Sequence, residues 1–117
     1  MEQKEALAFA NEWVNAWNSC DLDRILTHYS DDIEVSTPMI KMAADMEGNS
    51  LKGKKAVAEY WETALRKLPA LEFKLYDVAV GSNSVALYYE AVMGKKAIEV
   101  MFLNEQGKIE KMIAHYT

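Results

Sequence analysis

Apolar side chains recur every three or four positions near the start of the chain, within "EALAFANEWVNAW" at residues 5–17. The recurring residues are Ala6, Phe9, Trp13 and Trp17, with Leu7, Ala10 and Val14 beside them. This spacing predicts an amphipathic helix that buries one face. The residues "NSCD" interrupt it, and Asp21 is a suitable N-cap for a short second helix that carries Ile25, Leu26 and Tyr29.

The next stretch, "YSDDIEVSTP" at residues 29–38, changes to a period of two. Ile33 and Val35 point one way while the polar residues between them point the other, which predicts a short, half-buried strand. Pro38 cannot donate a hydrogen bond to a sheet, so the strand ends there or lies at an edge. Thr37 therefore stands at the end of the strand, where a side chain can face a cavity, although its hydroxyl is a poor acid or base.

Residues 39–52 have no clean period and contain three methionines. We expect an ordered loop or a lid here, because a structureless stretch of this length in a small domain is often functional. Helical spacing then returns in "KKAVAEYWETALRKLP", and Pro69 ends this third predicted helix.

Beyond residue 70 the period is two. The run "LEFKL" alternates and then slips by one position near Tyr76 and Asp77, which predicts a bulge. The turns "GSNS", "GKK" and "NEQG" separate the runs "VALYYEAVM", "AIEVMFL" and "KIEKMIAHYT". We therefore expect an α+β fold in which three N-terminal helices pack on one face of a curved, mainly antiparallel sheet of four long strands and one short early strand.

The composition fits one globular domain over residues 1–117, since 50% of the residues are hydrophobic and 26% are charged. The net charge is −5, and the scattered lysines and arginines give no footprint for nucleic acid or for an anionic membrane, so neither partner is expected. A single cysteine excludes an internal disulfide, and the N-terminal residues do not read as a signal peptide, so we expect a cytoplasmic protein. No apolar run approaches the ~20 residues of a membrane helix.

The sequence carries none of the glycine-rich or nucleophile motifs that bind nucleotides or form acyl-enzymes. The two histidines, His28 and His115, fall on different elements and make no metal motif. We therefore expect no cofactor and no metal. Cys20 lies in a turn without a nearby base in the sequence, and we expect it to be inert.

The order of elements resembles the SnoaL-like and ketosteroid-isomerase-like members of the nuclear transport factor 2-like superfamily. The resemblance runs from "WVNAWNSCDLDRILTHYSDDIEV" through the helix opened by "LKGKKAVAEYW" to the final "GKIEKMIAHYT". It implies a cone-shaped α+β barrel, in which the sheet curls round the helices and the open end is an apolar pocket. Proteins that look like this isomerise steroids, cyclise polyketides, hydrolyse epoxides or only bind partners, so the fold alone does not name an activity.

The resemblance also assigns roles to three positions. In the ketosteroid isomerases an Asp before the proline that ends the first strand is the general base, and here that position is Thr37. The oxyanion-stabilising Tyr of the first helix falls on Trp13, and the second oxyanion donor, an acidic residue, falls on Glu99. Only Glu99 keeps its type, which disfavours that isomerase chemistry but keeps a pocket with polar donors.

Glu99 is the candidate catalytic residue. It shares one strand face with Ala97 and Met101, and no Lys or Arg adjoins it on that face. A carboxylate removed from water without a cationic partner has a raised pKa, so we expect Glu99 to be protonated at neutral pH and to donate a hydrogen bond to a ligand oxygen. The alternative is a strand glutamate that reaches solvent at the rim.

By comparison with the family, the residues expected to bind ligand are Trp13, Tyr29, Thr37, Trp61, Met112 and Tyr116. Plain core packing is the alternative for the aromatic residues of the helices, including Trp17 and Tyr60. His115 falls on the outward face and His28 at a boundary, so we expect neither to be catalytic. Asp45 and Glu47 could supply a base if the loop closed over the cavity, and solvated surface is the alternative for both.

A second subunit is expected, because Val100, Phe102, Ile109 and Ile113 make the outer strand face too apolar to remain in water. The chain is thus predicted to form a homodimer. Its function is predicted to be that of a SnoaL-like pocket protein for a small apolar ligand or substrate, an isomerase, cyclase or dehydratase-like enzyme acting on an apolar carbonyl compound. The alternatives are a non-catalytic ligand-binding or dimerisation module of the same fold, and a protein adaptor.

Overall fold

The computed structural model describes residues 1–40, 49–68 and 71–117. Asp45, Glu47 and most of the expected loop or lid lie outside the described residues, so the expectations made for them are not addressed by the structure. The helices of the described part are α1 (Gln3–Asn18), α2 (Leu22–Leu26), α4 (Lys54–Lys67) and the 3-10 helix η1 (Val92–Gly94). The strands are β1 (Tyr29–Ser36), β2 (Ser50–Lys52), β3 (Lys74–Val80), β4 (Ser84–Glu90), β5 (Lys96–Leu103) and β6 (Ile109–Tyr116).

Two main helices form the helical layer, where the sequence predicted three. The expected second helix is present as α2, but it is only five residues long. Asp21 caps it as predicted, accepting a hydrogen bond from the backbone N–H of Arg24 at 3.3 Å. The chain must already enter β1 at Tyr29, which leaves room for little more than one turn. The long helix α1 ends just before Cys20, whose φ of 58° lies in the left-handed region that stops a helix.

The strands form one six-stranded sheet in the order β2-β1-β6-β5-β4-β3. Its neighbours pair antiparallel except β1 and β6, which pair parallel. The α+β class and the mainly antiparallel sheet are confirmed, and the predicted bulge is present as a register shift between Leu75 and Asp77. The sequence pattern did not predict the parallel pair, because local periodicity does not show which distant strands pair. It did not predict β2 either, because three residues are too few to show an alternation.

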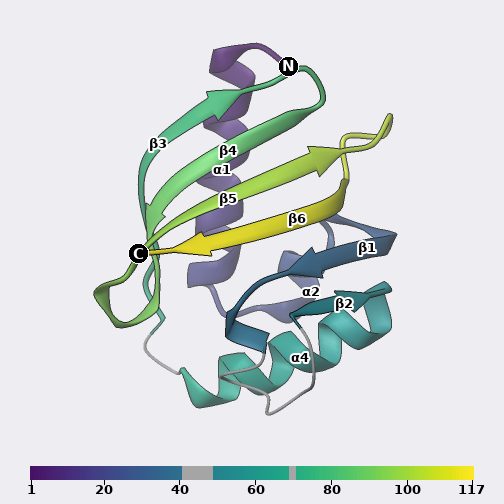
Figure 1. Ribbon diagram of the computed structural model, residues 1–117, viewed down its shortest axis with the longest axis vertical. Helices are drawn as coiled ribbons and strands as arrows, with labels where there is room; N and C mark the ends of the chain where they lie inside the picture. The colour runs from purple at the N-terminus through teal and green to yellow at the C-terminus, as the bar shows by residue number, and fades with distance from the viewer. Residues whose placement is uncertain (41–48, 69–70) are drawn as a thin grey trace.

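The sheet curves round the helices (Figure 1). Helix α1 runs behind β3 and β4 in this view, and α4 crosses the end of the molecule beside β1 and β2. The predicted inward face of β5 is confirmed, since Ala97, Glu99 and Met101 are all buried there. None of the helices in the described ranges is long and apolar enough to cross a membrane.

One face assignment in the last strand was wrong. Ile109 was expected on the outer face together with Ile113, but it is fully buried in the core. The β5–β6 register shifts between Phe102 and Leu103, so Ile109 pairs with Leu103. This irregularity lets two successive residues, Glu110 and Lys111, face outward before Met112 turns in again.

Candidate ligand-binding cavity

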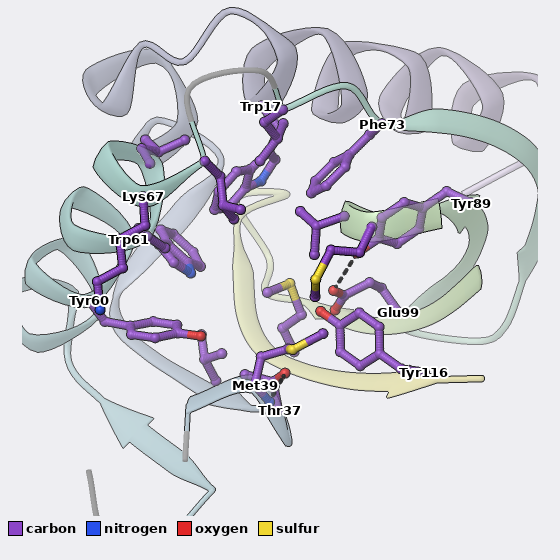
Figure 2. A pocket seen from close by; sticks show the side chains of 18 of the residues that line it. Trp17, Thr37, Met39, Tyr60, Trp61, Lys67, Phe73, Tyr89, Glu99 and Tyr116 are labelled. Atoms are coloured by element: carbon purple, nitrogen blue, oxygen red, sulfur yellow. Dashed lines mark hydrogen bonds between the residues drawn. The ribbon is translucent and has the colours of Figure 1, made fainter. Parts of the chain in front are cut away.

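A cavity of about 240 Å³ lies between α1, α4 and the inner face of the sheet. Figure 2 shows its side chains converging from both helices and from the strands. Aromatic rings make much of the wall, with Trp13 and Phe73 stacked at 5.7 Å and Trp17 and Trp61 edge-to-face at 5.0 Å between ring centroids. The volume is below the roughly 300–1,000 Å³ of pockets for drug-sized ligands. A ligand of one or two rings fits such a space better than a larger one.

Glu99 brings a carboxyl group to this apolar wall. The residue is 4% exposed, and among the described residues it is the one buried side chain of the types Asp, Glu, Lys, Arg and His. The Tyr89 hydroxyl donates a hydrogen bond to Oε1 at 2.8 Å, while Oε2 has no hydrogen-bond partner in the described part of the chain. Burial raises the pKa of Glu99 to about 7, and the Tyr89 hydrogen bond opposes this by stabilising the carboxylate. Near neutral pH the group is therefore poised between acid and carboxylate.

Thr37 and Tyr116 lie beside Glu99 on the sheet side of the cavity (Figure 2). Thr37 is 6% exposed, and its Oγ1 accepts a hydrogen bond from the Met39 backbone N–H at 3.2 Å. Burial and the nearby Glu99 raise the pKa of the half-buried Tyr116, and the hydroxyls of Thr37 and Tyr89 lower it. Tyr116 therefore remains a neutral hydrogen-bond donor. These four residues, Thr37, Tyr89, Glu99 and Tyr116, form what we call the sheet-side polar cluster.

Tyr29 supports the wall from behind. Its hydroxyl accepts a hydrogen bond from Trp13 Nε1 at 2.8 Å and lies 3.7 Å from the sulfur of Met112. Trp13, Thr37, Trp61, Glu99, Met112 and Tyr116 line the cavity, whereas Tyr29 does not. We therefore assign Tyr29 to positioning Trp13 and Met112 rather than to contact with a ligand.

Two lining tyrosines were not singled out from the sequence. The period of two in "VALYYE" places Tyr89 on the inner face with Leu87, but its contact with Glu99 depends on the β4–β5 register. Tyr60 was interpreted as core packing, yet its ring lines the cavity from α4 and the residue is half-buried. Burial and the nearby Glu99 raise the pKa of Tyr60 to about 12, so its hydroxyl also stays protonated.

The cavity opens between the end of α4 and η1. Lys67, Leu68, Leu71, Val92 and Met93 line both the cavity and an adjoining, more polar groove of about 560 Å³. Met93 is 73% exposed at this opening. The cavity and the groove therefore adjoin each other between the end of α4 and η1.

The histidines lie away from the cavity. His115 is exposed, and its Nδ1 is 3.3 Å from the Ile98 carbonyl oxygen. His28 lies 3.1 Å from Glu12, which also forms an ion pair with Arg24 at 2.7 Å. Within the described ranges, no three His, Cys, Asp or Glu residues are grouped so that they could hold a metal ion.

The chain is similar to known proteins over most of its length. A family model described as a SnoaL-like domain matches residues 10–114. A crystal structure of a SnoaL-like protein of unknown function from Burkholderia thailandensis is 40% identical with a TM-score of 0.94, over 99% of this chain and 97% of that chain. A search of curated proteins found no match.

More distant structures share the fold alone. A candidate isomerase of the SnoaL-like family from Agrobacterium tumefaciens is 18% identical with a TM-score of 0.77, over 97% of this chain and 98% of that chain. AclR, a candidate hydroxylase from Streptomyces galilaeus, is 21% identical with a TM-score of 0.73, over 99% of this chain and 91% of that chain. An NTF2-like protein of unknown function from Cytophaga hutchinsonii is 13% identical with a TM-score of 0.71, over 100% of this chain and 91% of that chain.

Proposed function

The chain belongs to the SnoaL-like domain family, and we propose that it binds a small apolar carbonyl compound whose oxygen is held by Glu99. The observation that carries this proposal is a buried carboxyl group at the wall of a largely apolar cavity. One oxygen of this group, Oε2, has no hydrogen-bond partner among the described residues. Buried polar groups are nearly always hydrogen-bonded, so an unpaired carboxyl oxygen calls for an explanation, and a bound ligand is one.

The ligand class follows from the chemistry of the wall. A protonated Glu99 is a donor, and a carbonyl oxygen is an acceptor that an apolar molecule can carry into such a cavity at low desolvation cost. Oε2 is buried, so a neighbouring side chain must move before a ligand oxygen can reach it. Met39 and Met112 line the cavity and have the flexible side chains that can make this adjustment.

The proposed reaction class is that of an isomerase, cyclase or dehydratase-like enzyme. Such reactions pass through states with negative charge on a carbonyl oxygen, and a donor placed at that oxygen stabilises them. A pKa of about 7 suits Glu99 to this role, because acid catalysis is most efficient when the pKa lies near the working pH. The candidate isomerase among the distant structures supports this class by fold only.

A non-catalytic binding module is the second candidate, and Thr37 favours it. Its hydroxyl cannot remove a carbon-bound proton near neutral pH, and it is already engaged with the Met39 backbone. As a binding module, the protein would hold a carbonyl compound through a hydrogen bond from Glu99 and catalyse no reaction of it.

Binding can be tested with 1-tetralone, a bicyclic ketone, and with tetralin, the same skeleton without oxygen. Trp13, Trp17 and Trp61 all line the cavity, so quenching of tryptophan fluorescence reports occupancy. At pH 6 we expect the ketone to bind at least about fivefold more tightly than the hydrocarbon, the value of roughly one hydrogen bond. Glu99→Gln should keep part of this preference and Glu99→Ala should abolish it. Equal affinity for the two compounds in the wild type would overturn the proposal.

Exchange of hydrogen for deuterium next to the carbonyl of 1-tetralone separates the two candidates. An enzyme of the proposed class should accelerate this exchange in heavy water, measured by proton NMR, and Glu99→Ala should remove the acceleration. Tight binding without acceleration would instead identify a binding module for this class of compound.

A further inference from the structure

Tyr60 places a second hydrogen-bonding group at the cavity, far along the chain from the sheet-side polar cluster. It projects from α4, and Figure 2 shows its ring directed into the cavity with the hydroxyl pointing away from the helix. The hydroxyl has no hydrogen-bond partner among the described residues, in contrast to Tyr89, which donates to Glu99. The neighbouring Trp61 belongs to the same helix and also lines the cavity.

The opposite wall holds the sheet-side polar cluster. Figure 2 places Tyr60 and Tyr116 on opposite sides of the cavity, with Tyr60 on α4 and Tyr116 on β6. Much of the remaining wall is apolar, including Val35, Leu65 and Phe73. Trp17 also lines the cavity, and its buried indole N–H has no hydrogen-bond partner in the described part of the chain. The Tyr60 hydroxyl and the sheet-side polar cluster therefore lie on opposite walls, with a largely apolar space between them.

We propose that the ligand carries two oxygens, a carbonyl oxygen held by Glu99 and a second oxygen at its far end that accepts a hydrogen bond from the Tyr60 hydroxyl. This inference rests on the proposed function, since it takes the Glu99 end of the ligand as given. It makes Tyr60 a specificity-determining residue and defines the ligand class as hydroxy-ketones or diketones on a skeleton of one or two rings.

The physical reason is the fate of the Tyr60 hydroxyl when the cavity fills. Tyr60 is half-buried and its hydroxyl is not among the fully buried unpaired atoms, so water can reach this group. A ligand that displaces the water without offering an acceptor leaves the hydroxyl unpaired, and sites built to hydrogen-bond a ligand oxygen reject analogues that lack it. The far-end oxygen should therefore improve affinity well beyond its effect in an apolar pocket.

The test compares 1-tetralone with its 5-, 6- and 7-hydroxy derivatives, which carry the second oxygen at different places on the far ring. We expect at least one of the three to bind the wild type about five- to tenfold more tightly than 1-tetralone, by tryptophan fluorescence. Tyr60→Phe keeps the ring and removes the hydroxyl. It should reduce the ratio of the affinity for the hydroxy derivative to that for 1-tetralone to about one, while the affinity for 1-tetralone stays nearly unchanged. Tyr88→Phe is the matched control, because this tyrosine is exposed and does not line the cavity.

The outcomes separate the two proposals. If 1-tetralone binds but no hydroxy derivative binds more tightly, or if the preference persists in Tyr60→Phe, the two-oxygen inference is wrong and the proposed function stands. If neither 1-tetralone nor its derivatives bind the wild type, both are overturned. The melting temperature of Tyr60→Phe should match that of the wild type, which shows that the changed ratio is not a folding defect.

Discussion

The Tyr89 hydroxyl donates to Oε1 of Glu99 at 2.8 Å from the neighbouring strand. The two residues are not directly opposite each other, because Glu99 pairs with Leu87 and Tyr89 pairs with Ala97. The contact is therefore a diagonal one on the inner face of the sheet, within reach of a long aromatic side chain. It fixes the carboxyl group at the cavity wall and lowers the cost of ionising it.

Removing this donor should raise the pKa of Glu99. In Tyr89→Phe the carboxylate loses the hydrogen bond that opposes the effect of burial, so the pKa should move above its wild-type value of about 7. The measurement is an NMR titration of the carboxyl carbon in protein labelled with ¹³C at glutamate. Tyr88→Phe, the outward neighbour, should leave the titration unchanged, and a lower pKa in Tyr89→Phe would contradict the assigned role.

The raised pKa of Glu99 predicts how stability depends on pH. The group has a pKa near 4.5 when unfolded and about 7 when folded, so between these values the folded protein binds more protons than the unfolded chain. The protonated Glu99 therefore stabilises the folded state. This contribution to the free energy of unfolding is complete below pH 4.5 and is lost as the pH rises through 7. The wild type should therefore lose on the order of 3 kcal/mol of unfolding free energy relative to Glu99→Gln between pH 4.5 and pH 8.

Urea denaturation of the two proteins across this range measures the difference. Other titrating groups contribute equally to both proteins and cancel in the comparison. A difference that does not change with pH would mean that Glu99 titrates normally and faces solvent.

Asn18 should couple stability to the shape of the cavity. Its side-chain amide donates to the Phe73 carbonyl at 2.9 Å and accepts from the Phe73 N–H at 2.6 Å, so it fastens the end of α1 to the segment before β3. Asn18→Ala should lower the free energy of unfolding by about 1–3 kcal/mol. It should also weaken 1-tetralone binding, because Phe73 lines the cavity. Asn11→Ala on the exposed face of the same helix should do neither, and an unchanged melting temperature in Asn18→Ala would count against this coupling.

The outer sheet face is expected to pair with a second copy of the chain. Tyr76, Tyr88 and Ile98 are 41%, 37% and 45% exposed, and Val100 and Ile113 are half-buried on the outer faces of β5 and β6. Light scattering should give twice the chain mass of 13.3 kDa at micromolar concentration. Ile98→Glu should reduce it to the monomer mass, while Met93→Glu, which changes an exposed apolar residue beside the cavity opening, should not. A monomeric wild type would exclude the dimer.

Local periodicity predicted much of the fold, including the strand that carries Glu99. The alternation put Glu99 on one strand face with Ala97 and Met101, and the family resemblance favoured the pocket over the solvent-exposed rim. The slip near Tyr76 revealed the bulge. The resemblance inferred from the sequence is confirmed by the family match and by the similar structures. These features are encoded by residues that lie next to one another in the chain.

The features that the sequence did not predict depend on register between distant segments. Ile109 faces the core because the β5–β6 register shifts beside it. The local sequence pattern does not reveal this shift. Tyr89 meets Glu99 only in the observed β4–β5 alignment. Tyr29 and Trp61 are both predicted from the sequence as buried aromatic residues. Only the packing shows that Trp61 lines the cavity and that Tyr29 packs against lining residues without lining it.

The parallel pairing of β1 with β6 also determines when the cavity can exist. Strand β6 lies between β1 and β5 and supplies Met112 and Tyr116, yet it is made after every other strand of the sheet. A chain still emerging from the ribosome can form α1 and the β3–β4 hairpin, but it cannot close the wall until residues 109–116 have left the exit tunnel. Ligand binding therefore requires residues 109–116, and loss of these residues would leave β1 paired with β2 alone.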